Sequence, residues 1–362
     1  MCYNSGTKRF QKGMTPMNTL TNMIFHRQLP SPEELQAAVP LSPEGKAAKA
    51  RRDQEIADVL SGKDSRILLI IGPCSADRED AVLEYITRLV PVQEKVKDKI
   101  LIIPRIYTNK PRTTGDGYKG IASQPDPTKR PDMEKGLISL RHLHVTAVNT
   151  TGLSCADEML YPGNDGYLAD VLSYVAVGAR SVENQQHRLV ASGLSVPVGM
   201  KNPTSGDLSV MLNSITAAQH PHIFSYTGWE VETKGNPLAH AILRGSVDNT
   251  GRTIPNYHYE DLMGLYEQYQ AKGLKNMAVV VDANHANSGK RYLEQIRIVN
   301  EVLHACRHSS EIRSLVKGFM VESYLVDGAQ KIGDGVYGQS ITDPCLGWEK
   351  TAAMICEMAD QL

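Results

Sequence analysis

The chain contains 362 residues, of which 41% are hydrophobic and 22% are charged, and its formal net charge at pH 7 is −1. This is an ordinary globular composition, and the near-neutral charge excludes a general nucleic-acid-binding surface. No apolar run reaches the roughly 18 residues of a membrane span, and the first residues lack the apolar core of a secretory signal. The six cysteines are scattered without a CxxC pair. We therefore expect a cytoplasmic protein that binds neither nucleic acid nor membranes.

The first 62 residues are predicted to form an extension that precedes the main domain. Residues 1–30 are polar with little periodicity, which predicts an arm that is partly disordered at its start. Ser31-Pro32-Glu33-Glu34 and Ser42-Pro43-Glu44 are both typical of helix starts, with serine as the cap and proline at the first helical position. The second helix is expected to reach about Leu60 and to end at Gly62. We interpret 1–62 as an oligomer-forming or regulatory extension and 63–362 as the catalytic domain.

From residue 63 onward, apolar runs alternate with segments of helical periodicity. The expected strands are 66–71, 101–103, 153–156, 172–177, 196–200, 222–226, 278–281 and 318–321, and the expected helices are 79–90, 133–144, 164–173, 182–192, 207–218, 259–272 and 290–305. This alternation implies parallel strands with right-handed crossovers, and eight such units predict a (β/α)8 TIM barrel. The segment 227–257 is rich in Gly, Thr and Asn, and we interpret it as an inserted hairpin or loop between strands six and seven.

Polar or reactive residues follow seven of the eight expected strands, at the barrel end where active sites lie. In 101–114, LIIPRIYTNKPRTT, a buried strand leads directly into a cationic loop. The cations expected at this mouth are Arg105, Lys110, Arg112, Arg180, Lys201 and Arg244. Cations so close together repel one another unless anions bind, which predicts substrates with more than one phosphate. Taken separately, 101–114 is also compatible with a solvated basic loop, and Arg180 or Arg244 with a structural salt bridge.

Four further residues at the same mouth are candidate metal ligands: Cys74, His285, Glu322 and Asp343. A thiolate, an imidazole and two carboxylates can hold a divalent first-row transition ion and leave one position open. Their spacing along the sequence is wide, so the pattern alone is weak. A lone buried cysteine is usually a small hydrophobe, and a lone histidine is more often a hydrogen-bonded core residue. The shared barrel mouth makes the four plausible together.

Several motifs in order resemble one family, the class I 3-deoxy-D-arabino-heptulosonate 7-phosphate (DAHP) synthases. The motifs are IGPCSA (71–76), PRIYTNKPRTT (104–114), YKG (118–120), VGAR (177–180), HRLVASGLSVPVGMKN (187–202), ILRG (242–245), DANHANSGK (282–290), VES (321–323) and SITDPCLGWE (340–349). The resemblance runs from about residue 30 to the C-terminus. It implies a (β/α)8 barrel with an N-terminal extension. It also implies condensation of phosphoenolpyruvate with erythrose 4-phosphate to give DAHP and phosphate, the first step of the shikimate pathway to chorismate and the aromatic amino acids.

The resemblance also implies a role for each matching residue. Phosphoenolpyruvate would be held by Arg105, Lys110, Arg180, Lys201 and Arg244, and the phosphate of erythrose 4-phosphate by Arg112 and Thr113. Glu158, Ala179 and Asp343 complete the substrate-binding set, and Lys110, Arg105 and His285 are the catalytic candidates. Cys74, His285, Glu322 and Asp343 match the ligands of one divalent ion, Mn, Fe, Co or Zn. The family implies a homodimer or homotetramer, with Phe, Tyr or Trp as feedback effector acting through the N-terminal extension and the surface around Ser195.

Departures from the family pattern leave these ligands in place but alter their surroundings. This chain has Glu158-Met159-Leu160-Tyr161 where the family has Glu-Phe-Leu-Asp, and Asn284 where the family has serine. The sequence after Arg180 also differs, as does the spacing before Tyr118-Lys119-Gly120. Two alternatives remain open. One is a related synthase that makes an octulosonate or nonulosonate, and the other is a non-catalytic barrel kept as a subunit or regulator.

Overall fold

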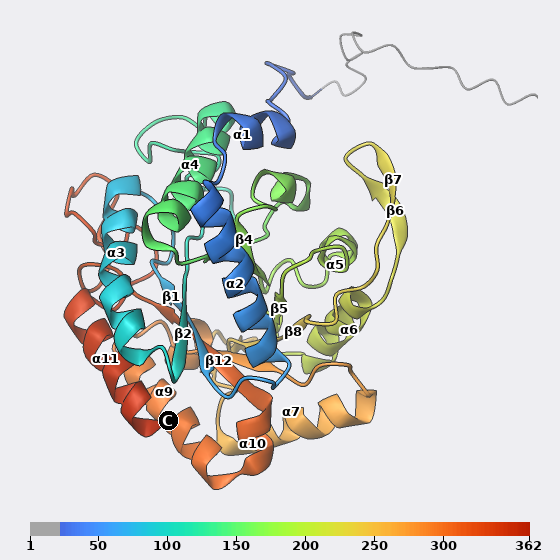
Figure 1. Cartoon of the computed structure of the whole chain (residues 1–362), viewed down its shortest axis with the longest axis vertical. Coiled ribbons are helices and arrows are strands. Elements are labelled where there is room, and N and C mark those ends of the chain that lie inside the picture. The colour runs from blue at the N-terminus through green and yellow to red at the C-terminus, as the bar shows by residue number, and fades with distance from the viewer. Residues whose placement is uncertain (1–21) are drawn as a thin grey trace, which may run out of the picture.

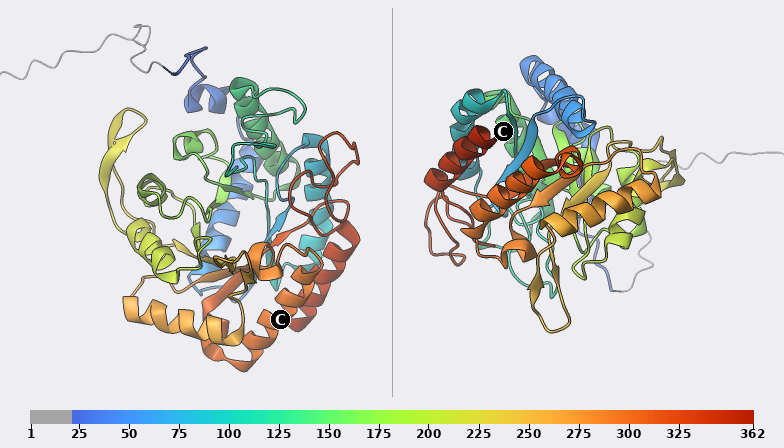
Figure 2. Two further views of the ribbon diagram at one scale, coloured as in Figure 1. Left: turned by 180° about the vertical axis from the view of Figure 1, so that it is seen from behind. Right: turned by 90° about the horizontal axis from the view of Figure 1, so that it is seen from below.

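Eight parallel strands close into a barrel at the centre of the molecule, with helices around it (Figures 1 and 2). The computed structural model describes residues 22–362. The barrel strands are β1 (Ile67–Gly72), β2 (Ile100–Pro104), β3 (Cys155–Glu158), β4 (Leu172–Val177), β5 (Val198–Lys201), β8 (His240–Leu243), β11 (Val279–Asp282) and β12 (Val316–Glu322). They are hydrogen-bonded in the order β2-β1-β12-β11-β8-β5-β4-β3. The predicted (β/α)8 barrel is thus confirmed.

The barrel closes between β2 and β3, the two ends of this order. There an isolated parallel bridge joins Arg105 to Ala156, and the Ile106 N–H donates to the Ala156 carbonyl at 2.9 Å. Each of the other neighbouring pairs joins three or more residues, although β3–β4 and β11–β12 each contain a register shift. Strand β1, for example, pairs in register with both β2 and β12. The ring is therefore complete, but the junction between β2 and β3, which we call the seam, has fewer backbone pairings than the others.

Helices follow most of the strands, as a barrel of crossovers requires. They are α1 (Pro32–Ala38), α2 (Pro43–Leu60), α3 (Glu79–Val96), α4 (Met133–Thr151), the 3-10 helix η1 (Pro162–Tyr167), α5 (Gln185–Ala191), α6 (Leu208–Gln219), α7 (Tyr259–Lys272), α8 (His285–Ser288), α9 (Glu294–His308), α10 (Ser310–Leu315) and α11 (Trp348–Gln361). Among the described residues, no helix is both long and apolar enough to cross a membrane.

The N-terminal helices begin where the sequence predicts. The Ser31 side chain accepts from the Glu34 N–H in a capping box, and the Ser42 side chain accepts from the Gly45 N–H. Helix α2 runs to Leu60, and Gly62 follows with φ +79°. The predicted arm at 1–30 lies mostly outside the described residues, and the domain boundary at residue 62 stays a prediction.

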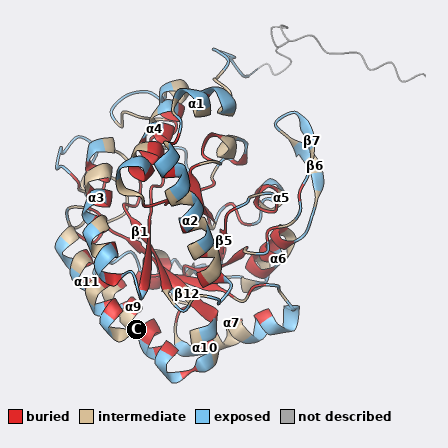
Figure 3. Ribbon diagram, viewed as in Figure 1, coloured by how far each residue is buried: buried red, intermediate tan, exposed pale blue. Residues whose placement is uncertain are grey.

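Two apolar cores hold the barrel together, one inside the ring of strands and one between the strands and the helices. Figure 3 shows the central strands as buried, whereas the surrounding helices alternate between buried and exposed residues. The inner core contains side chains such as Leu68, Tyr174 and Val280. Ile56, Val59 and Leu60 of α2 belong to this inner core and are fully buried. Burying each such side chain contributes about 1.5–3 kcal/mol, so α2 is part of the barrel's own packing.

The expected sixth strand at 222–226 is wrong as a barrel strand. This segment instead forms strand β6 (Ile223–Tyr226), which pairs with β7 (Trp229–Glu232) in an antiparallel hairpin that extends away from the barrel (Figure 1). Its two-residue turn, Thr227-Gly228, has positive φ at both positions, as a tight hairpin turn requires. The sixth barrel strand is β8, which lies inside the segment 227–257 that was interpreted as an insertion. A small hairpin, β9 (Ser246–Val247) with β10 (Thr253–Ile254), does lie between barrel strands six and seven.

The expected helix at 164–173 is also wrong. The chain forms the short η1 there and then enters β4 at Leu172. The cause is visible in the residues, because Pro162, Gly163 and Gly166 are poor helix formers and two of them lie within one turn. The remaining helices agree with prediction within a few residues at their ends, except that α3 and α4 extend six and seven residues further.

Candidate active site

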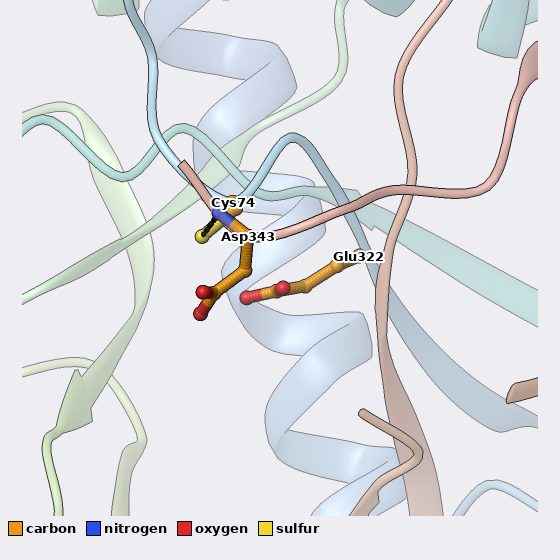
Figure 4. A group of neighbouring side chains, drawn as sticks. All are labelled: Cys74, Glu322 and Asp343. Atoms are coloured by element: carbon orange, nitrogen blue, oxygen red, sulfur yellow. Dashed lines mark hydrogen bonds between the residues drawn. The ribbon is translucent and has the colours of Figure 1, made fainter. Parts of the chain in front are cut away.

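A thiol and two carboxylates meet at the end of the barrel where the strands finish (Figure 4). One donor atom from each of Cys74, Glu322 and Asp343 lies within 4.8 Å of the other two. Cys74 and Glu322 are buried, and Asp343 is half-buried. The Asp343 backbone N–H donates to the Cys74 Sγ at 3.4 Å. We call these three residues the acidic thiol cluster.

Strand pairing explains why the acidic thiol cluster forms from residues far apart in sequence. Strands β1 and β12 are parallel, with Gly72 opposite Glu322, so Cys74 follows at the same edge. The chain after β12 then returns to this edge. The Leu346 N–H donates to the Glu322 carbonyl, the Leu346 carbonyl accepts from the Tyr324 N–H, and Cys345 pairs with Gly328. This return places Asp343 over the ends of the strands.

His285, the fourth predicted ligand, lies beside the cluster. Its Nε2 is 3.9 Å from the Glu322 Oε1, while its Nδ1 lies 2.8 Å from the Oδ2 of Asp282. At this separation the carboxylate favours a proton on Nδ1, which leaves Nε2 with its lone pair, as in metal-ligating histidines. His285 begins α8 with φ +50°, an uncommon conformation for a residue with a side chain.

Two of the predicted cations contact the cluster directly. The Lys110 Nζ donates to the Cys74 Sγ at 2.6 Å. The Arg105 guanidinium is 2% exposed, donates to Glu322 Oε1 at 3.0 Å and to the Pro73 carbonyl, and stacks on the Tyr107 ring at 3.6 Å. Charge and hydrogen bonding through its two terminal nitrogens thus offset the cost of burying this guanidinium, while its Nε has no hydrogen-bond partner among the described residues.

The ionisation of these groups reflects their neighbours. Burial, reinforced by Glu322, raises the pKa of the Cys74 thiol. Burial alone would lower the pKa of Lys110, but Cys74 and Glu322 together hold it above its usual value. Burial would raise the pKa of Asp343, but Lys110 and Lys290 keep it well below its usual range. Lys110 is therefore an ammonium at neutral pH.

A pocket next to the cluster gathers six of the predicted site residues. It is lined by Pro111, Glu158, Gly178, Ala179, Arg180, Ser181, Lys201, Thr204, Arg244 and His285. Lys201 and Arg244 are buried, and Arg180 is exposed at the rim. The Lys201 Nζ lies 3.5 Å from Asp282 Oδ2 and 3.8 Å from Glu158 Oε2. Burial lowers the pKa of Arg244. We call this space the cationic pocket.

Arg112 and Thr113 do not line the cationic pocket. The half-buried Arg112 donates from Nε to the Tyr118 carbonyl at 2.7 Å, and Thr113 is exposed. Both belong to a loop whose base is held where the Lys110 N–H donates to the Lys119 carbonyl at 3.1 Å.

Some residues of this site were not singled out from the sequence. Asp282 links His285 to Lys201, and Asn284 donates from Nδ2 to Glu322 Oε2. The Gln295 side chain accepts from the Glu322 N–H at 2.8 Å and donates to the Glu322 carbonyl at 2.9 Å. Lys290 lies 2.9 Å from Asp343. Asp282 and Asn284 belong to the strand-end motif DANH, which was a usable signal. Gln295 lies in a helix, and nothing in the sequence marks it.

A barrel of parallel strands with charged and ligand-type side chains at the carboxyl ends of those strands has the architecture of a barrel enzyme. The sequence model of the DAHP synthetase I family matches residues 39–355 of this chain. The chain is 38% identical to a phospho-2-dehydro-3-deoxyheptonate aldolase of Corynebacterium glutamicum, over 93% of this chain and 92% of the relative. It is also 38% identical to the Phe-sensitive enzyme of that name from Escherichia coli, over 92% and 94%. Other relatives are named Tyr-sensitive and Trp-sensitive.

A solved structure of the same kind of enzyme has the same fold. The phospho-2-dehydro-3-deoxyheptonate aldolase from Francisella tularensis superposes with a TM-score of 0.87 and 35% sequence identity, over 94% of this chain and 98% of that one. The chain belongs to the DAHP synthetase I family. The resemblance found in the sequence motifs is thereby confirmed.

Proposed function

We propose that the protein condenses phosphoenolpyruvate with erythrose 4-phosphate to give DAHP and phosphate, at the start of the shikimate pathway in the cytoplasm. The observation that carries this proposal is the adjacency of the acidic thiol cluster and the cationic pocket, which share His285 and Asp282 as neighbours. One group has the donors of a transition-metal site, and the other has cations suited to a small, multiply charged anion.

The cationic pocket is our proposed site for phosphoenolpyruvate. Arg180, Lys201 and Arg244 line it, and Lys110 and Arg105 contact the acidic thiol cluster. Glu158 and Ala179 complete the wall. Arginine forks match carboxylate and phosphate oxygens, and the bound anion would offset the mutual repulsion of the cations.

Arg112 and Thr113 are our proposed contacts for the phosphate of erythrose 4-phosphate. Their position outside the cationic pocket supports this division, because the sugar must present its aldehyde inward and its phosphate outward. Arg112 is fixed at Nε by the Tyr118 carbonyl, which leaves its terminal nitrogens to bind the phosphate.

The donor set fits one divalent transition ion. Cys74, Glu322 and Asp343 supply a sulfur and two carboxylates within reach of one another, and His285 faces Glu322 with its Nε2. Soft and borderline donors in one site are typical of Mn, Fe, Co or Zn rather than of Mg or Ca. When bound there, such an ion would supply Lewis-acid polarisation of the sugar aldehyde.

The side chains of the chain perform the remaining tasks. The clamped phosphoenolpyruvate presents C3 to the aldehyde carbon, and a C–C bond forms between them. The Lys110 ammonium, protonated at neutral pH, is positioned to donate a proton to the aldehyde oxygen as negative charge develops there. Positive charge develops at C2, and water adds to that carbon while its released proton restores the Lys110 ammonium. The bond between C2 and the phosphate oxygen then breaks, the hydroxyl proton goes to the departing phosphate, and C2 becomes the ketone of DAHP. Arg105 and the other cations hold the departing phosphate and the carboxylate throughout.

The test is a phosphate-release assay with the purified full chain and each candidate sugar phosphate. We expect phosphoenolpyruvate to be consumed with erythrose 4-phosphate and not with arabinose 5-phosphate, and a chelator to abolish turnover. Lys110→Gln is expected to lose nearly all activity, whereas Lys119→Gln, a change in the same loop, is expected to keep it. Equal turnover with arabinose 5-phosphate would favour the octulosonate alternative, and no turnover with any sugar the non-catalytic one.

A second cavity supports a feedback effector. It has a volume of about 710 Å³ and lies beneath the β6–β7 hairpin, between that hairpin and the segment around Ser195. Phe224, Tyr226 and Val231 give it apolar walls, while Asp165 and Lys234 offer opposite charges. This combination suits a zwitterion with an aromatic side chain. We propose that Phe, Tyr or Trp binds there, in line with the names of the relatives.

The effector site is tested by adding each aromatic amino acid to the assay. We expect at least one of them to inhibit. Ser195→Phe, which would fill part of the cavity, is expected to remove inhibition and leave uninhibited turnover intact, and Ser310→Phe on an exposed helix start is the matched control. Inhibition that persists in the Ser195 variant would place the effector elsewhere.

A further inference from the structure

Three histidines that play no part in the proposed reaction line one outer cavity of about 560 Å³. His258 immediately precedes α7, and His304 and His308 lie four residues apart on α9. Two carboxylates, Glu260 and Glu301, line the same cavity. None of these residues lines the cationic pocket or belongs to the acidic thiol cluster.

The hydrogen bonds of two of these imidazoles match those of metal ligands. His258 Nδ1 lies 2.6 Å from the Oε1 of Glu301, and Glu301 is itself held by Arg297 at 2.7 Å. His308 Nδ1 lies 3.1 Å from the His304 carbonyl. With a proton on each Nδ1, both Nε2 atoms carry a lone pair. A carboxylate or a carbonyl on Nδ1 is the usual support of a histidine that binds a metal through Nε2.

His304 and His308 have the spacing of a chelating pair. Residues four apart on a helix lie on one face, and the rings of His304 and His308 are 4.3 Å apart between centroids. The only group of three donors mutually within 4.8 Å in the described residues is the acidic thiol cluster. Ion binding at the outer cavity therefore requires a rotamer change, which exposed imidazoles such as these make readily.

We propose that His258, His304 and His308 form a second, outer site for a divalent transition ion. Imidazole nitrogens suit Zn²⁺, Cu²⁺ and Ni²⁺, and the two carboxylates add a favourable negative potential. The site would link the start of α7 to the end of α9, two helices that follow different barrel strands. It is separate in residues and in donor chemistry from the sulfur-containing site at the mouth.

The test counts ions on the metal-free full chain after equilibrium dialysis against Zn²⁺. We expect two ions per wild-type chain and one in His304→Gln/His308→Gln, whose outer-site affinity falls about 100-fold or more. His142→Gln/His220→Gln, two exposed histidines elsewhere, is the matched control and is expected to keep both ions. Glu301→Gln is expected to weaken the outer site about 10-fold without abolishing it. Turnover is expected to stay the same in the double variants.

A spectroscopic measurement separates the two sites. Cu²⁺ bound at the outer site is expected to show splitting from several nitrogens in its electron paramagnetic resonance spectrum, which the His304/His308 variant lacks. One ion per wild-type chain that is lost in Cys74→Ala would overturn the outer site. One ion that survives Cys74→Ala but disappears in the His304/His308 variant would instead support the outer site and overturn the proposed metal at the mouth.

Discussion

Asp282 connects the two halves of the proposed site through a single carboxylate. Its Oδ2 lies 2.8 Å from the His285 Nδ1 and 3.5 Å from the Lys201 Nζ. Burial would raise the pKa of Asp282, but His285 and Lys201 hold it well below its usual range. It is therefore a permanent anion that orients a proposed metal ligand and a proposed substrate cation, and we regard it as a positioning residue.

Replacing Asp282 with Asn is predicted to weaken both functions. Without the carboxylate, the His285 tautomer is no longer fixed and metal affinity is expected to fall about 10- to 100-fold. The KM for phosphoenolpyruvate is expected to rise as well, because Lys201 loses its partner. Metal titration followed by initial-rate kinetics checks both effects, with Asp248→Asn, a change at a half-buried turn residue outside the site, as control. Unchanged metal affinity would show that Asp282 acts on folding or on Lys201 alone.

The two outer cations are predicted to serve different substrates. Arg112→Ala is expected to raise the KM for erythrose 4-phosphate about 10- to 100-fold, since a lost charge-assisted contact costs about 1.5–3 kcal/mol. Arg180→Ala is expected to do the same for phosphoenolpyruvate. Steady-state kinetics with each substrate varied in turn measures this, and the exposed Arg130→Ala is the control. If both variants weaken the same substrate, the division proposed here is incorrect.

For individual residues, the sequence indicates which side chains lie at the barrel mouth but not which neighbours contact them. Charged residues after apolar runs predicted Lys201 and Glu322 at one mouth, because the ends of parallel strands meet there. The contact of Lys110 with Cys74 and the support of Glu322 by Gln295 depend on side-chain directions within the folded barrel. Such contacts have no periodicity in the sequence, so they could not be predicted from it.

His240 shows how strongly one strand can depend on pH. It begins β8 inside the barrel, fully buried, with Nε2 2.8 Å from the Tyr174 hydroxyl and Nδ1 2.8 Å from the Leu238 carbonyl. Burial lowers the pKa of His240 to about 4, although the Leu238 carbonyl opposes the shift. The folded state therefore holds a neutral imidazole, which the unfolded chain protonates below about pH 6.5.

Acidification is predicted to destabilise the barrel through this group. The unfolded state binds a proton on His240 that the folded state does not bind. The contribution of His240 to stability is therefore complete above pH 6.5 and is lost as the pH falls towards 4. The loss between pH 7 and pH 5 is about 2 kcal/mol for a shift of this size. Denaturant unfolding at several pH values is expected to show a flatter pH dependence in His240→Asn than in wild type or the exposed His220→Asn. Parallel profiles for all three would contradict this explanation.

The misplaced sixth strand shows that an alternation of apolar runs and helical segments cannot distinguish a barrel strand from a strand of an inserted hairpin. Residues 222–226 do form a strand, but every second side chain faces solvent, as in a hairpin. The true barrel strand, His-Ala-Ile-Leu, is only four residues long and contains one strongly apolar pair. A short strand in a barrel is stabilised by its two neighbours, β5 and β11, rather than by its own pattern. The long, uniformly apolar β1 had no such ambiguity.

On the scale of the whole molecule, the β6–β7 hairpin exposes large apolar side chains that the other described residues of this chain do not cover. Ile223 and Trp229 are 67% and 72% exposed on it. Large apolar side chains on a projecting hairpin with free edges are typical of contact surfaces between chains. We propose that this surface contributes to the homodimer or homotetramer expected from the sequence.

Charged substitutions on the hairpin are predicted to reduce the assembly. Ile223→Lys/Trp229→Glu is expected to lower the molar mass measured by light scattering, from that of a dimer or tetramer towards a smaller species. Leu293→Lys, another large exposed side chain outside the hairpin, is the matched control. An unchanged mass in the hairpin variant would place the interface elsewhere.

The seam between β2 and β3 has a consequence for how the barrel and its ligands influence each other. The ring is joined there by the isolated Arg105–Ala156 bridge, and the proposed substrate residues Arg105 and Glu158 stand on its two sides. A ligand that holds both sides favours the closed ring over any state in which the seam has parted. By thermodynamic reciprocity, a change that favours the closed seam must raise the affinity for such a ligand by the same factor. Substrate affinity and resistance to local opening are then two measures of one coupling energy.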